Sequence, residues 1–481
     1  MIYNCTDKFT VARATFLDPF GLTEAALDSA IGMAMSQGVE DADIYLQRKV
    51  SETYSLENGV VKGGHFKIEQ GFGLRAVANG KSTVAHSSEI GASALFEAAK
   101  AAGAIGGRAS RPISPRNADR DSWKIPDCYL ETQFVSEEAK LDILGNVQKI
   151  AQKSTDGIKY IAAALCGDFE LIYIVKRDGV RAVDIRPSVR LGIHVVLERG
   201  GRIGASSGGW GGRCGYDGFT GARLEHIVSE AVRKAALGFD ARSVSLGEMP
   251  VILKSGGAGL LLHEAIGHGL EADAVHAGRS VYSGGVGERV ASEGVTLVDD
   301  GTVYGHAGSL AIDDEGNPSR QIVLVERGIL RGYLHDETSA HRSNAAAASN
   351  GRRESYKHPT LPRMTNTLLL SGDVSPDEIL QSVHNGLYVA DVGDGEVNIT
   401  TGNFVLSIEE AYWVERGKIQ YPVKGMTLIG NGPNVLRNIG MVGNDMALDS
   451  GLISCAKNGQ KVPVGVGQPT LRVDKGLTIG Q

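Results

Sequence analysis

The chain has 481 residues, of which 42% are apolar and 22% are charged. These values are typical of a folded globular protein and exclude a fibrous repeat or a largely disordered chain. The formal net charge is −7 without a long run of like charges, which argues against non-specific nucleic-acid binding. No segment is apolar over the about 18 residues that a membrane span requires, and residues 1–20 lack a signal-peptide pattern. We therefore expect a cytoplasmic protein with no nucleic-acid or membrane partner.

The first half of the sequence, residues 1–245, predicts an N-terminal α+β domain: an antiparallel sheet with packed helices, which can divide into two subdomains near 110–130. A helix is expected over 22–37, with Thr23 as its N-cap. Apolar and polar residues then alternate as in an antiparallel meander. The turns of this meander are expected at the dipeptides Asn58-Gly59, Gly63-Gly64 and Asn79-Gly80.

Helical periodicity indicates three further helices, at 92–105, 136–153 and 222–237. Strand patterns return at 158–202, with Asp178-Gly179 and Gly200-Gly201 as turns. The glycine-rich segment 204–219 predicts a loop, either a flexible connector or a substrate-edge loop that carries Trp210.

The second half, residues 246–481, predicts a β-rich, barrel-like domain. Short strands separated by glycine turns dominate it, and one helix is expected at 376–386. The predicted fold class is therefore α+β, with a candidate metal-binding segment on an irregular helix of this second domain.

That segment is SGGAGLLLHEAIGHGLEAD, residues 255–273, which brings His263, Glu264 and His268 within six positions. Two imidazoles can hold a metal ion, and a neighbouring carboxylate can take a proton from a water molecule. The spacing is HExxxH rather than the HExxH of many zinc peptidases. In a regular α-helix, residues i and i+5 point about 140° apart, too far for one small ion. We therefore predict a π-type widening or a break at this segment, helped by Gly267 and Gly269.

A third ligand cannot be chosen from spacing. The candidates are Glu271, Asp273, His276, His306 and a distant cysteine. The alternative interpretation is an ordinary helix whose histidines are satisfied by hydrogen bonds. The odd number of widely spaced cysteines argues against a disulfide framework, so a functional cysteine would act as a thiolate.

Several long segments closely resemble the TldD/PmbA proteins, and within that family the TldD-type subunit, a zinc-dependent peptidase. The resemblance runs over nearly the whole chain. The segments that carry it are LENGVVKGGHFKIEQGFGLRA (56–76), LLLHEAIGHGLEAD (260–273), GERVAS (287–292), GSLAIDDEGNPS (308–319), NGRRESYKHPTLPRMTNT (350–367), VKGMTLIGNGP (423–433) and CAKNGQKVPVGVGQPTLRV (455–473).

The resemblance implies His263, His268 and Cys455 as ligands of Zn²⁺ and Glu264 as the general base. It also implies a peptidase that acts on short or unfolded peptides, paired with a PmbA/TldE-like paralogue as a heterodimer or with itself as a homodimer. Two other functions stay open: a non-catalytic peptide-binding protein with a structural metal, and a metal-dependent hydrolase of another amide or ester.

Four other patterns invite a functional interpretation. The acidic run Asp313-Asp314-Glu315 is read as a hairpin turn with solvated charges rather than a calcium site. Arg352 and Arg353 are expected in a surface ion pair with Glu354 rather than bound to a substrate carboxylate. His306, Tyr356 and Arg353 are candidates for stabilising an oxyanion. The segment LIGNGPNVLRNIG departs from a dinucleotide fingerprint and is read as a loop near the active site.

Overall fold

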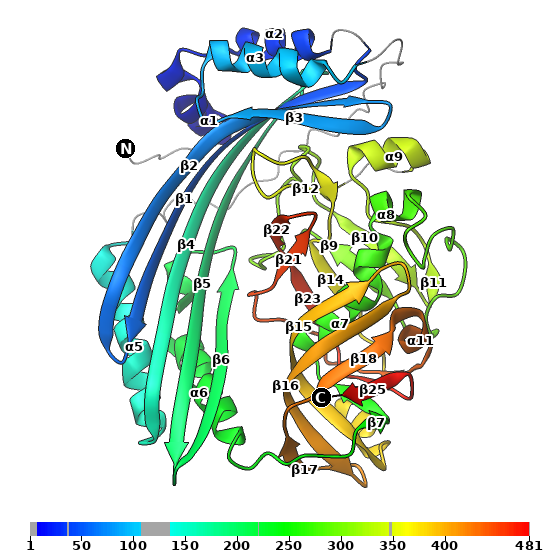
Figure 1. The fold of residues 1–481 in the computed structure, drawn as a ribbon. Coiled ribbons are helices and arrows are strands. Elements are labelled where there is room, and N and C mark those ends of the chain that lie inside the picture. The colour runs from blue at the N-terminus through cyan, green and yellow to red at the C-terminus, as the bar shows by residue number, and fades with distance from the viewer. Residues whose placement is uncertain (1–6, 36–37, 107–134, 220, 346–348, 481) are drawn as a thin grey trace.

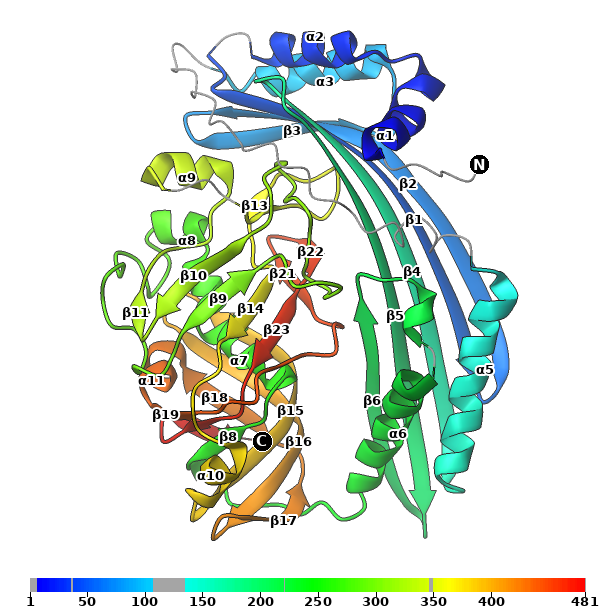
Figure 2. The same cartoon turned by 180° about the vertical axis from the view of Figure 1, so that it is seen from behind.

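The computed structural model describes residues 7–35, 38–106, 135–219, 221–345 and 349–480. Long antiparallel strands run along one side of the molecule, and a β-rich body of shorter strands lies on the other side (Figure 1, Figure 2). The α+β architecture predicted from the sequence is confirmed. The expected subdomain division near 110–130 lies outside the described residues, and the boundary at residues 245 and 246 stays a prediction.

The long strands form one sheet in the order β3-β2-β1-β4-β5-β6. Its strands are β1 (Asp41–Glu57), β2 (Val60–Ala78), β3 (Lys81–Ser87), β4 (Ile158–Lys176), β5 (Arg181–Arg199) and β6 (Arg202–Gly212). Asn58-Gly59 and Asn79-Gly80 form turns with positive φ, as predicted. The turn expected at Gly63-Gly64 is wrong, because these glycines pair with Ser55 and Tyr54 of β1 and remain extended within β2.

Helices cover the sheet at its two ends (Figure 1). They are α1 (Lys8–Phe16), α2 (Glu24–Ala34) and α3 (Ala92–Gly103) at one end, and α5 (Glu137–Ser154) and α6 (Gly221–Leu237) at the other. The side chains of Thr23 and Ser136 accept hydrogen bonds from the first turns of α2 and α5, which fixes where these helices begin. The four predicted helices of this half are confirmed, with α2 shorter than expected. Helix α1 was not predicted.

Strand β6 replaces the loop that the sequence predicts at 204–219. Residues 202–212 pair along their length with β5, so that prediction is wrong for this part. The glycines are explained by close packing: a Cβ on Gly204 would lie 2.1 Å from the carbonyl oxygen of Ala235 in α6. The ring of Trp210 packs edge-to-face on Phe219, with centroids 5.5 Å apart. Glycine here permits close approach of neighbouring backbone rather than flexibility.

The second half contains two main sheets and a few short helices. The strand orders are β19-β24-β8-β15-β16-β18-β25-β7, with β17 beside β16, and β11-β10-β9-β14-β23-β20. The strands are β7 (Gly247–Glu248), β8 (Val251–Leu253), β9 (Leu297–Asp300), β10 (Gln321–Glu326), β11 (Ile329–Leu330), β12 (Gly351–Arg352), β13 (Leu361–Pro362), β14 (Asn366–Leu369), β15 (Asn385–Asn398), β16 (Asn403–Glu415), β17 (Lys418–Val423), β18 (Thr427–Asn431), β19 (Ile439–Val442), β20 (Ala447–Leu448), β21 (Ser454–Lys457), β22 (Gln460–Pro463), β23 (Gly465–Gln468), β24 (Leu471–Val473) and β25 (Leu477–Gly480). The short helices include α8 (Ala272–His276), α9 (Glu337–Ser343), α10 (Pro376–Gln381) and α11 (Gly432–Arg437). Helix α10 is the one predicted at 376–386 and ends earlier than expected.

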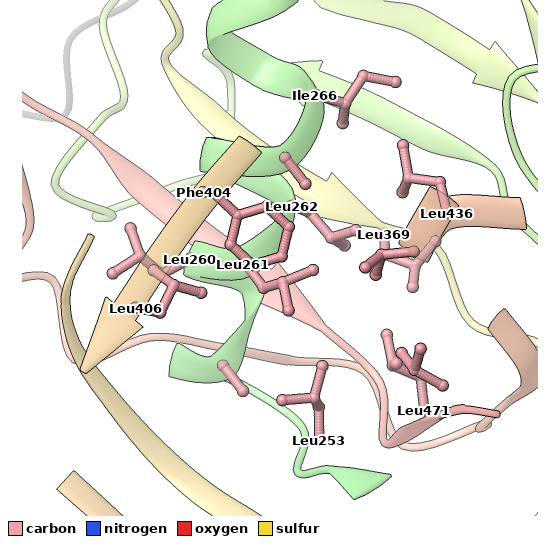
Figure 3. Packing of buried hydrophobic residues seen from close by; sticks show 14 of the residues in the cluster. Leu253, Leu260, Leu261, Leu262, Ile266, Leu369, Phe404, Leu406, Leu436 and Leu471 are labelled. Atoms are coloured by element: carbon pink, nitrogen blue, oxygen red, sulfur yellow. The ribbon is translucent and has the colours of Figure 1, made fainter. Parts of the chain in front are cut away.

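These sheets enclose the helical segment that begins at Leu260, as the predicted barrel-like arrangement requires. Figure 3 shows Leu260, Leu261 and Leu262 packed among Phe404 and Leu406. All three leucines are buried, so the segment that carries His263 is anchored in the core of this half. None of the helices in the described residues is long and apolar enough to cross a membrane.

A buried ion-pair network joins the long sheet to the second half. Arg75 on β2 contacts Asp43 on β1 and lies 2.8 Å from Glu315, and each of these three side chains is at most 2% exposed. Asp314 accepts hydrogen bonds from Arg186 of β5 and from the backbone of Arg353. The network therefore holds the two halves together through charged groups shielded from water.

This network overturns two expectations about charged residues. Asp313, Asp314 and Glu315 are fully buried rather than solvated. Asp314 and Glu315 pair with Arg186 and Arg75 of the long sheet, while Asp313 accepts hydrogen bonds from the backbone N–H groups of Glu315 and Asn317. Arg353 is also buried, with its guanidinium bonded to Asp43 and stacked on the Tyr45 ring rather than paired with Glu354 at the surface. Arg352 is buried as well and donates to the carbonyl groups of Met364 and Pro463.

Candidate metal centre

The segment that carries the two histidines is helical but irregular. It starts as α7 (Leu260–Leu262), continues as the π-helical turn η5 (His263–Gly267), and ends as the 3-10 turn η6 (His268–Leu270). The N–H of His268 donates to the carbonyl oxygen of His263, a bond between residues five apart. The predicted irregularity is therefore confirmed. Because the turn is widened, the two imidazole rings meet, with centroids 4.9 Å apart and planes at 85°.

Neighbouring residues support the widened turn. The hydroxyl of Tyr282 donates a 2.8 Å hydrogen bond to the carbonyl oxygen of Ala265, in the middle of the turn. Gly432, the first residue of α11, approaches the same carbonyl so closely that a Cβ there would lie 2.1 Å from it. The segment LIGNGPNVLRNIG, which was predicted to be a loop near the active site, therefore contains the end of β18 and the helix α11 and packs against the π turn.

Removing the Tyr282 hydroxyl should destabilise this region. The Tyr282→Phe variant leaves the buried carbonyl group of Ala265 without its donor, which should lower the free energy of unfolding by about 1–3 kcal/mol. Urea unfolding followed by fluorescence measures the change. The matched control is Tyr421→Phe, because the Tyr421 ring stacks under Arg242 and its hydroxyl bonds to no described residue. Equal stability of the two variants would contradict a supporting role for Tyr282.

Cys455 reaches the histidines from a distant part of the chain. It lies on the hairpin of β21 and β22, paired with Val462. Its Sγ is 3.3 Å from Nε2 of His268, although the two residues are 187 positions apart. One ligand atom from each of His263, His268 and Cys455 lies within 4.8 Å of the others. The structure therefore brings together the three residues that the family resemblance implies as metal ligands.

The electrostatics of the three groups favour a charged sulfur. Burial by itself raises the pKa of the Cys455 thiol, but the charges and hydrogen bonds of His263 and His268 lower it to about 4. Burial disfavours the imidazolium form of His268, yet the charge of Glu271 raises the pKa of His268 well above its ordinary value. The directions of both shifts favour a thiolate beside an imidazolium when no cation is bound. A divalent cation that binds there replaces a proton, as metal ligation generally does.

The donor set fits a zinc ion. Two imidazole nitrogens and one thiolate are ligands that Zn²⁺ prefers, and three protein ligands leave a coordination position open for water. In addition, Nδ1 of His263 is buried with no hydrogen-bond partner among the described residues. Buried polar atoms are rarely left without a hydrogen-bond partner, and a cation bound to this ring nitrogen would satisfy it.

Glu264 lies beside the centre with no hydrogen bond or ion pair to any described residue. It is 8% exposed and lines the same cleft as the two histidines and Cys455. Gly395 of β15 lies against it, since a Cβ there would be 3.1 Å from Cγ of Glu264. The side chain therefore packs against β15, while its carboxylate has no described partner.

The centre opens into a cleft of about 1700 Å³ between the long sheet and the second half. Residues 207–210 of β6 line it from the sheet side, and β15 lines it from the other side. Ion pairs of α6 with the two strands of the opposite wall, Lys234 with Asp391 and Arg233 with Glu410, join the two walls. The cleft is large enough for several residues of an extended peptide.

The alternative third ligands have other partners. His306 bonds to Asp449 at 2.8 Å, His276 to Ser343, and Asp273 to Lys457 at 2.7 Å. Glu271 contacts His268 on the side away from Cys455. Glu271 was predicted only as a candidate third ligand, and its spacing of three residues from His268 is the signal that could have indicated this contact.

The three residues that were candidates for stabilising an oxyanion lie outside the cleft lining. His306, Tyr356 and Arg353 do not line the cleft. Tyr356 is buried against the long sheet, where its backbone N–H donates to Gln47. This placement argues against the role considered for them.

Comparison with known proteins supports the resemblance seen in the motifs. Models of the PmbA/TldA metallopeptidase match the chain as domain 1 over 42–106, central domain over 131–238 and C-terminal domain over 246–480. The Metalloprotease TldD homolog of Haemophilus influenzae is 40% identical over 97% of this chain and 98% of its own length. A Zinc metalloprotease TldD homolog of Saccharolobus solfataricus is 34% identical over 49% of this chain and 52% of its own length.

The fold is shared with a solved structure. TldE from Thermococcus kodakarensis superimposes with a TM-score of 0.77, covering 95% of this chain and 100% of that one at 18% identity. That similarity shows the fold, while the sequence matches show the relationship. The chain belongs to the PmbA/TldD metallopeptidase family.

Proposed function

We propose that this protein is a zinc-dependent peptidase that hydrolyses peptide bonds in short or unfolded peptides. In this proposal His263, His268 and Cys455 hold the ion and Glu264 is the general base. The observation that carries it is the meeting of the three ligand side chains on the wall of one large cleft that Glu264 also lines. Relatives of this chain are named metalloproteases, and these names support the same activity.

Each group of the proposed site has a separate role in the reaction. Bound zinc would act as a Lewis acid that polarises the substrate carbonyl and lowers the pKa of a water molecule. Glu264 accepts the proton of the attacking water and returns it to the leaving amine. The buried imidazoles of the π turn and the thiolate of the β21–β22 hairpin keep the reacting groups beside Glu264. In this proposal the cleft takes an extended peptide chain.

We further propose that the active form is a complex with a PmbA/TldE-like paralogue or with a second copy. The common fold of this chain and TldE supports pairing between related subunits. A reducing compartment such as the cytoplasm suits the site, since Cys455 is a free cysteine that must stay unoxidised to bind metal. Co-purification with the paralogue, followed by size measurement in solution, tests this part.

The Glu264→Gln variant tests the proposed activity. It should retain zinc, because Glu264 is not among the ligands, while peptide hydrolysis should fall by about 10²–10⁴-fold. Elemental analysis gives the zinc content, and mass spectrometry of a peptide library, with the paralogue present, gives the cleavage rate. The matched control is Glu293→Gln, an exposed surface residue paired with Arg327.

The outcomes separate the competing functions. Unchanged cleavage by Glu264→Gln would contradict its role as base. A zinc-loaded wild type that binds peptides without cutting them would indicate a binding protein with a structural metal. Hydrolysis of ester or other amide substrates, without new peptide termini, would indicate a different hydrolase.

A further inference from the structure

The imidazole ring of His268 is held from both sides. Its Nε2 lies 3.3 Å from Sγ of Cys455, and its Nδ1 lies 3.1 Å from Oε2 of Glu271. Glu271 is three residues further along the chain, just after the 3-10 turn η6, and only 2% of its side chain is exposed. The two ring nitrogens therefore have separate partners, one inside the candidate metal centre and one outside it.

Glu271 is itself held by two cations from other segments. Nζ of Lys457 lies 3.2 Å from Oε2, and Nε of Arg363 lies 3.7 Å from Oε1. Lys457 belongs to strand β21, two residues after Cys455. Arg363 is fully buried and donates a 2.7 Å hydrogen bond to the backbone carbonyl of Cys455. Both cations thus connect Glu271 to the hairpin that carries the thiolate.

These contacts form a bridge between the two parts of the centre. The π turn supplies the histidines, the hairpin supplies Cys455, and the carboxylate of Glu271 lies between them with a partner on each. A carboxylate that accepts a hydrogen bond from Nδ1–H fixes the imidazole tautomer, orients the ring and leaves the Nε2 lone pair for a metal ion. Lys457 and Arg363 compensate the charge of the buried carboxylate, so it does not need to bind the ion itself.

We propose that Glu271 is a positioning residue of the metal centre. It holds the Nε2 lone pair of His268 toward the ion, and through Lys457 and Arg363 it fixes the hairpin so that Cys455 meets His268. This inference rests on the proposed zinc site and goes beyond the ligands and base assigned there. Glu271 does not contact the metal or the substrate.

Zinc affinity, measured by competition with a chromophoric chelator on the full chain, tests the proposal. Glu271→Gln should weaken zinc binding by about 10–100-fold, the usual effect of losing such a carboxylate. Glu271→Asp keeps the charge but withdraws it by one methylene, so its affinity should fall between that of Glu271→Gln and that of wild type. The matched control is Asp273→Asn, which also loses a carboxylate bonded to Lys457 but does not touch His268.

Cobalt substitution gives a second readout that a purely structural role would not move. The thiolate charge-transfer band and the ligand-field bands of bound Co²⁺ should keep the intensities of an unchanged ligand number in Glu271→Gln, with shifted positions. Wild-type affinity in both Glu271 variants would overturn the proposal. A spectrum that shows a lost ligand would also overturn it, because Glu271 would then bind the metal directly.

These measurements distinguish this inference from the peptidase proposal. If Glu271→Gln weakens zinc binding while the wild type cuts no peptide, the positioning role stands and the peptidase function fails. If the wild type cuts peptides and Glu271→Gln binds zinc normally, the peptidase function stands and the positioning role fails. A wild-type chain that binds no zinc contradicts both.

Discussion

Replacing either Cys455 or His268 with alanine should remove zinc from the purified protein, while the wild type carries one ion per chain. Each substitution leaves only two of the three protein ligands that lie within 4.8 Å of one another. A catalytic zinc site usually needs three protein ligands, so two should not retain the ion through purification. Elemental analysis by mass spectrometry, normalised to protein concentration, measures the zinc content.

The controls for this prediction are a cysteine and a histidine far from the cleft. Cys166 is a free cysteine of β4 that accepts a weak bond from Thr53, and His65 is exposed on β2. Alanine at either position should leave the zinc content unchanged. Stoichiometric zinc in Cys455→Ala and His268→Ala would exclude the proposed ligand set.

The second large effect is expected at Arg75, which lies in the junction between the long sheet and the second half. The variant Arg75→Met removes the cation that contacts Asp43 and Glu315 and leaves buried carboxylates without compensation. Breaking a buried ion pair from one side costs about 3–5 kcal/mol of stability. Urea unfolding at pH 7 should show a loss of this size. Lys67→Met, which removes an exposed pair with Glu69, should change stability by no more than about 0.5 kcal/mol.

The pH dependence of this defect follows from the carboxylates. Burial by itself raises the pKa of Asp43, but Arg75 and Arg353 lower it below its ordinary value. Burial raises the pKa of Glu315 well above its ordinary value even with Arg75 opposing it. Without Arg75, the folded-state pKa of Asp43 should also rise above that of the unfolded chain, whereas the pKa of Glu315 is already raised in the wild type. Such groups favour the folded state at low pH and lose that contribution as the pH rises through the folded pKa.

The deficit of Arg75→Met relative to wild type should therefore grow between pH 4.5 and pH 7. Parallel urea titrations of both proteins at several pH values measure it. A deficit that stays constant over this range would show that the carboxylates near Arg75 are already neutral in the wild type.

Local patterns were sufficient where a segment depends on its own residues. Helix α5 was predicted because its apolar spacing and the Ser136 cap are both local signals. The turns at Asn58-Gly59 and Asn79-Gly80 followed from the left-handed conformations that these residues tolerate. The widened turn at His263 was predicted because a regular helix cannot bring residues five apart onto one side.

Other features depend on partners that are distant in sequence. Strand β6 forms despite its glycines because β5 offers a backbone partner and α6 packs closely on Gly204. Asp314 and Glu315 are buried in contact with Arg186 and Arg75, which lie on strands far earlier in the chain. Neither partner can be identified from the local pattern of charges.

The sequence by itself determined the fold class, the family, the irregular helix and the pair His263 and His268 with Glu264 between them, because these follow from short-range spacing and recognisable motifs. Cys455 entered only through the family resemblance. Tertiary structure alone decided that its sulfur lies beside His268 and that Glu271, Lys457 and Arg363 connect the two. The physical reason is that packing of the two sheets, rather than any local preference, sets the distance between segments 187 positions apart.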